Sequence, residues 1–236
     1  MTNLTLYNYF RSSTSYRVRI ALELKKLPYT YKEIHLLNNG GEQNQPAYRA
    51  INPMGRVPTL VHKDTGAELT IAQSSAIIEY LDEAFPQSYQ LLPKDSQQKA
   101  KVREFCQIIN ADIHAYGNLK TLQYLEKNYG ADEEKKNTWV QHWVGQGLKA
   151  CETLLQKAAD QNSASSTALT KFCFGDSITA AECYLVPLIF MSQRFKVNLE
   201  NYPVLMRIYA EATGLEAFKK AHPYCQPDTP EELRII

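Results

Sequence analysis

Residues 5–24 read TLYNYFRSSTSYRVRIALEL, and this stretch decides the fold. A strand-like segment runs into the turn RSSTS, and a helical run follows directly. The first backbone N–H groups of a helix have no partner within the helix, and the helix dipole adds about half a positive charge there, so an anion can bind. The hydroxyl residues of this turn are Ser12, Ser13, Thr14 and Ser15. Each can donate to such an anion; the alternative is that one caps the helix and the others are solvated.

The composition indicates a folded protein without a strong charge bias. The chain has 236 residues, 44% hydrophobic and 22% charged, and its net charge is +1. This small net charge gives no bulk attraction to nucleic acids or acidic membranes. The first ten residues lack the features of a signal peptide, and the longest apolar run, residues 183–191, is too short to cross a bilayer.

The five cysteines are widely spaced, and their number is odd. The chain has no CxxC motif and no His/Cys spacing typical of zinc ligands, so neither a disulfide framework nor a zinc site is indicated. We therefore expect a cytoplasmic, reduced protein without a metal site.

The first 85 residues alternate strand and helix patterns. Strand patterns occupy residues 4–10, 30–37, 57–63 and 67–72, and helix patterns occupy residues 16–25 and 74–85. This order predicts a small α/β layer. Residues 86–95 contain two prolines and no periodic pattern, so they are interpreted as a linker.

Every strong pattern after residue 95 is helical. Asp95 is placed to cap a long helix that continues through Tyr116, and another helix is expected over residues 133–159. Thr179 and Glu182 have the spacing of a capping box, which predicts the start of a further helix.

The segment NPMGRVPTL, residues 52–60, places Val57-Pro58 directly before a strand. A cis bond before Pro58 would turn the chain sharply and leave the N–H and C=O groups of Val57 free. Free backbone groups at a sheet edge can pair with an extended peptide. The alternative is a trans proline that enters an edge strand.

Gln73-Ser74 opens the helix that follows the last predicted strand. Capping by Ser74 is the ordinary explanation, but a carboxylate there would also meet the hydroxyl group, backbone N–H groups and the helix dipole. Two helix N-termini and one exposed sheet edge suit a short peptide with a carboxylate at one end and a second anion at the other.

Five segments together carry a resemblance to a known family: SSTSYRVRIAL, NPMGRVPTL, QSSAIIEYL, RFKVNLENYP and HPYCQPDTPEELR. The chain resembles the zeta-class glutathione S-transferases, and within that class the maleylacetoacetate isomerases, over about residues 4–234. The Val-Pro and Gln-Ser motifs are shared by many glutathione transferases. The first segment and the last two are specific to the class.

The resemblance implies a glutathione transferase fold of the α/β plus all-α kind. A thioredoxin-like, glutathione-binding domain is expected over residues 1–86, and an all-helical, substrate-binding domain over residues 96–236. It also implies glutathione as the cofactor, a small-molecule substrate and a homodimer.

The motifs, matched residue by residue, give the site that the resemblance implies. The γ-glutamyl carboxylate of glutathione is expected on Gln73 and Ser74, its cysteinyl backbone at Val57, and its sulfur at the turn of Ser12 and Ser13. Four further residues are expected near the tripeptide or the second substrate: Gln43, His114, Asn118 and Leu119. A buried helix face is the alternative for His114 and Leu119.

The activity implied is the cis–trans isomerisation of maleylacetoacetate to fumarylacetoacetate in tyrosine and phenylalanine breakdown. Since a C=C bond does not rotate, a glutathione thiolate must add to it transiently. Ser12 is the expected donor to that thiolate, with Ser13 in reserve. Arg194 is expected to bind a substrate carboxylate because guanidinium matches that group in a bidentate manner; a surface arginine is the alternative.

The sequence departs from the family pattern at two positions. Thr14, which the resemblance also assigns to the cofactor site, stands where the family usually has cysteine. It is still a hydrogen-bond donor but cannot act as a thiol. Ala115 stands where relatives commonly have proline, which is expected to loosen the helix locally.

Two other functions stay open on the sequence. One is a general glutathione transferase that conjugates haloacids or other electrophiles, which needs the same thiolate but no cation for a dianionic substrate. The other is a non-catalytic glutathione-binding module. A thiol-transferring reductase is disfavoured because that chemistry needs a cysteine where this chain has Ser12.

Overall fold

The four predicted strands form one mixed sheet in the computed structural model, which describes residues 3–64, 67–161 and 170–235. The strands lie in the order β2-β1-β3-β4, and β1 pairs parallel with β2 and antiparallel with β3. β3 pairs antiparallel with β4. Every second residue of β1 is buried, as expected where a strand packs on the core. The four strands are β1 (Leu4–Asn8), β2 (Thr30–Glu33), β3 (Thr59–Asp64) and β4 (Ala67–Ala72).

The parallel pairing of β1 with β2 requires a crossover, and α1 (Ser13–Lys25) supplies it. Both α3 (Ser74–Ala84) and α10 (Glu216–Ala221) pack against α1, so this helix is buried on most of its surface. A short helix that the sequence analysis did not predict, α2 (Pro46–Ile51), precedes β3.

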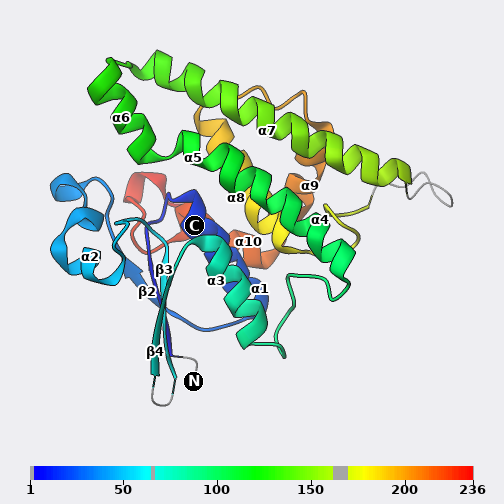
Figure 1. Cartoon of the computed structure of the whole chain (residues 1–236), viewed down its shortest axis with the longest axis horizontal. Helices are drawn as coiled ribbons and strands as arrows, with labels where there is room; N and C mark the ends of the chain where they lie inside the picture. Colours follow the sequence, from blue (N-terminus) through cyan, green and yellow to red (C-terminus); the bar gives the residue numbers. More distant parts are fainter. Residues whose placement is uncertain (1–2, 65–66, 162–169, 236) are drawn as a thin grey trace. The chain divides into compact units, whose positions relative to one another are not determined.

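Contacts divide the chain into two compact units, Met1–Leu91 with Leu215–Ile236, and Leu92–Gly214 (Figure 1). The sequence analysis assigned residues 215–236 to the helical domain. In the structure these residues group with the α/β unit, because α10 packs on α1. The expected architecture, a sheet layered with helices and followed by a helical region, is present in the described residues.

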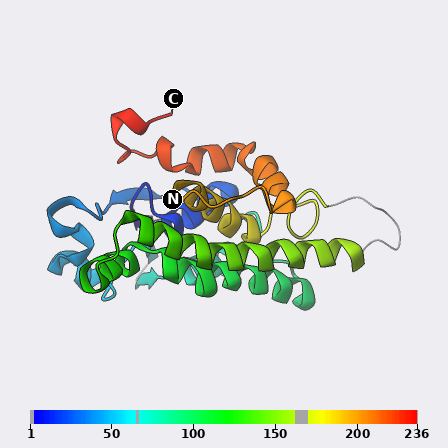
Figure 2. The ribbon, with the colours of Figure 1, turned by 90° about the horizontal axis from the view of Figure 1, so that it is seen from above.

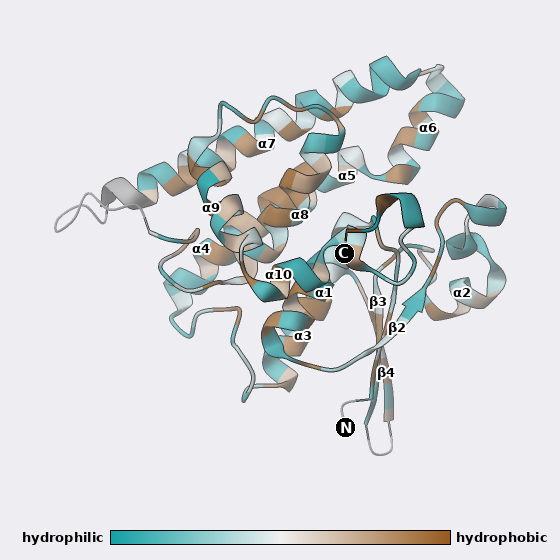
Figure 3. Cartoon of the chain, turned by 180° about the vertical axis from the view of Figure 1, so that it is seen from behind, coloured by the Kyte–Doolittle hydropathy of each residue, from teal (hydrophilic) through white to brown (hydrophobic). Residues whose placement is uncertain are grey.

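The second unit is helical, and α7 is its longest helix (Figure 2). α8 is hydrophobic along most of its length (Figure 3), and all its residues from Ala180 to Ile189 are buried. The predicted capping box at its start is confirmed, with the Glu182 carboxylate accepting the Thr179 N–H at 2.7 Å. None of the described helices has the length and apolar character of a membrane span. The α-helices are α4 (Ser96–Gln107), α5 (His114–Gly117), α6 (Leu119–Tyr129), α7 (Glu133–Gln161), α8 (Ala180–Arg194) and α9 (Pro203–Thr213).

The helix predicted to continue through Tyr116 is interrupted after α4. A π-helical turn, Ile108–Ile113, follows α4 and leads into α5. Gly147 of α7 lies against this turn, and a Cβ atom at Gly147 would come within 2.2 Å of the Ile113 side chain. The wider turn thus keeps Ile109 and Ile113 in the core.

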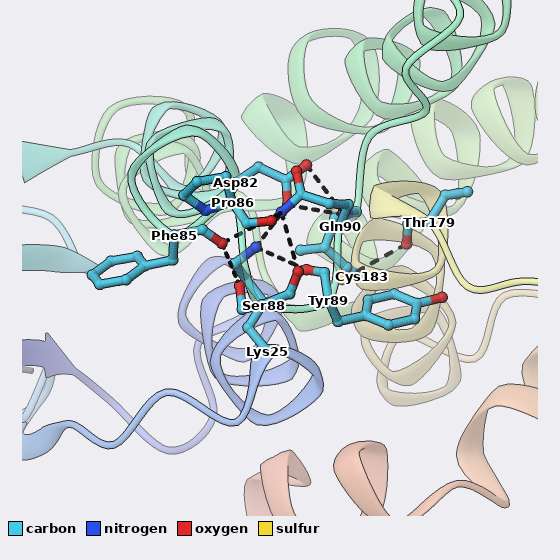
Figure 4. Close-up of polar contacts among 10 residues, drawn as sticks. Lys25, Asp82, Phe85, Pro86, Ser88, Tyr89, Gln90, Thr179 and Cys183 are labelled. Atoms are coloured by element: carbon cyan, nitrogen blue, oxygen red, sulfur yellow. Dashed lines mark hydrogen bonds and ion pairs between the residues drawn. The ribbon is translucent and has the colours of Figure 1, made fainter.

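A buried ion pair joins α1 to α3 in the first unit (Figure 4). Lys25 Nζ lies 2.8 Å from Asp82 Oδ1, and both side chains are almost fully buried. Lys25 also donates to the Tyr89 carbonyl at 2.8 Å, and Asp82 accepts the N–H of Leu91 at 2.8 Å. The first part of the predicted linker is therefore fixed to the α/β unit.

Replacement of Lys25 by methionine should destabilise the protein strongly, because it leaves the Asp82 carboxylate buried without its cation. A loss of about 3–5 kcal/mol in the free energy of unfolding is expected in urea titrations. The control is Lys63→Met, which removes an exposed ion pair with Glu68 and should cost less than about 1 kcal/mol. Equal losses of unfolding free energy in both variants would contradict the larger contribution expected of the buried pair.

Candidate active site

The turn between β1 and α1 has the geometry of a helix cap. The Ser12 N–H donates to the Tyr9 carbonyl at 3.1 Å, and the Ser12 hydroxyl accepts the Ser15 N–H at 3.2 Å. Ser12 is therefore the N-cap of α1, while Ser13 is its first residue. Ser12, Ser13 and Thr14 are half-buried, whereas Ser15 is fully buried.

A chain of hydroxyl groups connects this turn to the strand entry. Ser12 Oγ lies 3.0 Å from Thr14 Oγ1, which donates to the Val57 carbonyl at 3.0 Å. A hydroxyl group has one hydrogen, and Thr14 uses its own on Val57. It follows that Ser12 donates to Thr14, so the position that departs from the family pattern controls the direction of the Ser12 proton.

The Val57-Pro58 bond is cis, and this outcome settles the alternatives left open by the sequence. The expectation that a cis bond leaves the Val57 carbonyl free is wrong, because the Thr14 hydroxyl donates to it. A carbonyl oxygen has two lone pairs, so one further hydrogen bond to Val57 is still possible.

The start of α3 combines a strained residue with a buried cation. Gln73, and not Ser74, is the N-cap, and its backbone has φ 79° and ψ 118°. This φ lies in a region that side-chain-bearing residues rarely adopt, and such outliers gather at functional sites. Ser74 is buried, and its hydroxyl accepts a hydrogen bond from Arg17 Nη1 at 3.3 Å.

Arg17 is a residue that the sequence analysis missed. Its side chain is only 1% exposed, and it lies within a run of α1 that is otherwise mostly apolar and buried. A charged residue within an apolar run was the sequence signal that could have identified Arg17. Its guanidinium adds positive charge to the N-terminus of α3, which strengthens that end as an anion site.

Gln43 presents a buried amide whose oxygen has no hydrogen-bond donor among the described residues. Its amide nitrogen donates to the Leu36 carbonyl at 3.2 Å. Gly41, with φ +93°, allows this packing, because a Cβ atom there would come within 2.4 Å of the Gln43 amide nitrogen. The amide oxygen is therefore available to an N–H group of a ligand.

The remaining predicted residues lie in the helical unit. His114 begins α5 and is half-buried, as is Leu119 at the start of α6, so neither belongs to a fully buried face. Asn118 is the N-cap of α6, and its side chain accepts the Thr121 N–H at 3.1 Å.

Arg194 is the last residue of α8 and is exposed, with its guanidinium 5.0 Å from the centre of the Phe195 ring. The turn that follows is held by Gln141 of α7, which donates to the Phe195 carbonyl at 2.9 Å and to the Lys196 carbonyl at 3.3 Å. Gln141 thus fixes the chain next to Arg194.

The chain matches known proteins over nearly its whole length. Residues 11–84 match the family described as glutathione S-transferase, N-terminal domain. The maleylacetoacetate isomerase of Pseudomonas aeruginosa is 45% identical over 96% of this chain and 99% of that protein. A probable maleylacetoacetate isomerase 2 of Drosophila melanogaster is 44% identical over 97% of this chain and 91% of that protein. A holo structure of maleyl pyruvate isomerase, a bacterial zeta-class enzyme, has a TM-score of 0.85, with 40% identity over 96% of this chain and 100% of that one.

The chain belongs to the zeta-class glutathione S-transferases. The resemblance carried by its motifs is therefore confirmed. The maleylacetoacetate isomerase of Anaeromyxobacter dehalogenans was solved with glutathione bound in its active site. Its structure has a TM-score of 0.83, at 36% identity over 97% of this chain and 99% of that one. Thr14, the position at which this chain departs from the family pattern, is hydrogen-bonded to both Ser12 and the Val57 carbonyl.

Replacement of Gln73 by glycine should stabilise this zeta-class protein. The backbone strain at Gln73 is of the order of 1–3 kcal/mol, and the extra freedom of glycine in the unfolded chain offsets about 0.5–1 kcal/mol of it. Urea titration should therefore show a gain in the free energy of unfolding of about 0.5–2 kcal/mol. Gln123→Gly, in the exposed part of α6, is the control and should lose about 1 kcal/mol. A loss in both variants would mean that Gln73 is not strained.

Proposed function

We propose that the protein is a glutathione-dependent maleylacetoacetate isomerase, which converts maleylacetoacetate to fumarylacetoacetate in tyrosine and phenylalanine breakdown. Relatives named for this activity support the proposal. The observation that carries it is the Ser12 hydroxyl, held at the N-cap of α1 within the segment that matches the glutathione transferase family.

Groups in the α/β unit fit glutathione. The N-terminus of α3, with the Ser74 hydroxyl and the Arg17 guanidinium, suits a carboxylate. The second lone pair of the Val57 carbonyl suits a peptide N–H, and so does the buried Gln43 amide oxygen, which has no donor among the described residues. Ser12 would hold the sulfur.

When bound, glutathione supplies a thiolate that makes the substrate double bond transiently single. Ser12 stabilises that charge by donating a hydrogen bond to it, and the N-terminus of α1 adds its dipole. A free thiol has a pKa of about 8.5, and each unit of lowering favours the thiolate by about 1.4 kcal/mol. To act in this way, the Ser12 hydroxyl must rotate its proton from Thr14 toward the sulfur.

Arg194 would bind a carboxylate of the substrate. The substrate carries two carboxylates, and guanidinium matches such a group with two parallel hydrogen bonds. Arg194 is an exposed residue at the end of α8, and the Gln141 contacts hold the turn beside it. A general glutathione transferase would not need this cation, so Arg194 separates the two activities.

Replacement of Ser12 by alanine should raise the pKa of the bound glutathione thiol and lower turnover by about 10²-fold or more, the scale of a lost charge-stabilising donor. The absorbance of the thiolate at about 240 nm, followed against pH, measures the pKa of the bound thiol. Ser13→Ala is the matched control and should change both values little. If the two variants exchange these outcomes, Ser13 is the donor.

Replacement of Arg194 by alanine should weaken isomerisation of the dianionic substrate by roughly 10- to 150-fold in kcat/KM, corresponding to about 1.5–3 kcal/mol for a charge-assisted pair. Conjugation of a neutral electrophile should change little. Arg103→Ala, at an exposed position of α4, is the control. An equal loss toward both substrates would make Arg194 structural, and unchanged isomerisation would favour the general transferase.

A homodimer and a cytoplasmic location are proposed on the family resemblance. Light scattering of the purified protein measures its oligomeric state.

A further inference from the structure

Residues 216–235, which begin with α10, form a tail with its own internal hydrogen bonds. Gln226 donates to the Lys220 and His222 carbonyls, each at 2.8 Å, and Thr229 donates to the Pro223 carbonyl at 2.7 Å. Arg234 donates back to the Thr229 carbonyl at 3.0 Å. These bonds fix the shape of the tail, and with it the position of the side chains that the tail presents.

Asp228 of this tail bridges two elements of the sheet layer. One carboxylate oxygen accepts the Phe10 N–H at 2.9 Å, and the other accepts the hydroxyl hydrogen of Tyr31 in β2. Burial raises the pKa of the Tyr31 phenol, and the hydrogen bond to Asp228 acts in the same direction, so Tyr31 stays a donor. Phe10 lies only two residues before Ser12.

Arg19 makes a second connection between the same turn and the tail. Its guanidinium donates to the Phe10 carbonyl at 2.8 Å and to the Tyr9 carbonyl at 3.3 Å. Its Nε donates to the Ala221 carbonyl at 3.1 Å, in the last turn of α10. Both backbone polar groups of Phe10 are thus held, one by Asp228 and the other by Arg19.

Apolar contacts support the same connection. Tyr9, Phe10, Tyr48 and Val57 form a buried cluster, and Tyr224 and Leu233 of the tail pack against it. This cluster contains Tyr9, whose carbonyl accepts the Ser12 N–H, and Val57, whose carbonyl accepts from Thr14. The tail therefore packs against the cluster that includes Val57, and through Asp228 it contacts Phe10, next to the turn that bears Ser12.

We infer that the tail is a brace for the active-site turn and that Asp228 is a positioning residue for activation of the thiol by Ser12. This inference rests on the proposed function. Because Asp228 holds Phe10, the Tyr9 carbonyl and the Ser12 N–H bonded to it keep their places. A donor that is displaced by about 1 Å can lose roughly 10²-fold in rate.

The test is Asp228→Asn, which keeps the size of the side chain but replaces one acceptor oxygen with an amide that cannot accept a hydrogen bond. The expected results are a higher pKa of the glutathione thiol and a fall of about tenfold or more in kcat. The KM for glutathione should change less than twofold, because Gln73 and Ser74 are untouched. Asp176→Asn, the same change at a carboxylate that accepts the Lys171 N–H in the other unit, is the control.

Hydrogen exchange of the peptide over residues 9–14, measured without glutathione, tests the brace independently of the reaction. It should become faster in Asp228→Asn and stay unchanged in Asp176→Asn. Unchanged exchange overturns the brace even if the enzyme is not an isomerase. Faster exchange with an unchanged thiol pKa and kcat overturns the positioning role and leaves the tail merely structural.

Tyr31→Phe is the second variant in case Asp228→Asn does not fold. It removes one of the two hydrogen bonds to Asp228 and keeps the one from Phe10. A smaller shift of the same sign in exchange rate and thiol pKa is expected, and no shift in either contradicts the inference.

Discussion

The buried guanidinium of Arg19 fixes the turn on which the α/β unit builds its site. It donates to the backbone carbonyls of Tyr9, Phe10 and Ala221, and to the side chain of Asn8. Burial lowers the pKa of this guanidinium, because desolvation disfavours the charged form, whereas the surrounding tyrosines and Asp228 act in the opposite direction. A buried charge is tolerated only where hydrogen bonds satisfy it, so the carbonyl groups of the turn must stay in place.

The polar groups around this turn are placed mainly by the backbone. Gln73 has an unusual φ at the start of α3, and Gly41 has a positive φ and lies so close to Gln43 that a Cβ atom would collide with its side chain. Helix starts supply the N–H groups for anions, and they need no flexible side chain to do so. Backbone groups that already have their positions need little rearrangement to stabilise a charge that develops during a reaction.

The sequence predicted what depends on local pattern. The four strands, α1, α3 and the capping box of α8 were found because their periodicity and caps lie within a few residues of one another. The contact of Thr14 with Val57 spans 43 residues, and that of Phe10 with Asp228 spans 218, so no local rule could give them. The π-helical turn before α5 was missed for a related reason, because the close approach of Gly147 that accompanies it comes from another helix.

Thr14 also determines the redox chemistry of the turn. A cysteine at the first turn of a helix has a depressed pKa and is therefore open to oxidation and alkylation, whereas a threonine hydroxyl is inert to both. Of the five cysteines, Cys106, Cys151, Cys173 and Cys183 are buried, and burial raises the pKa of Cys151 to about 12. Cys225 is exposed as a residue, but partial desolvation of its thiol still raises its pKa. The protein thus carries no activated thiol of its own at the turn, and the reactive sulfur there has to arrive with each molecule of glutathione.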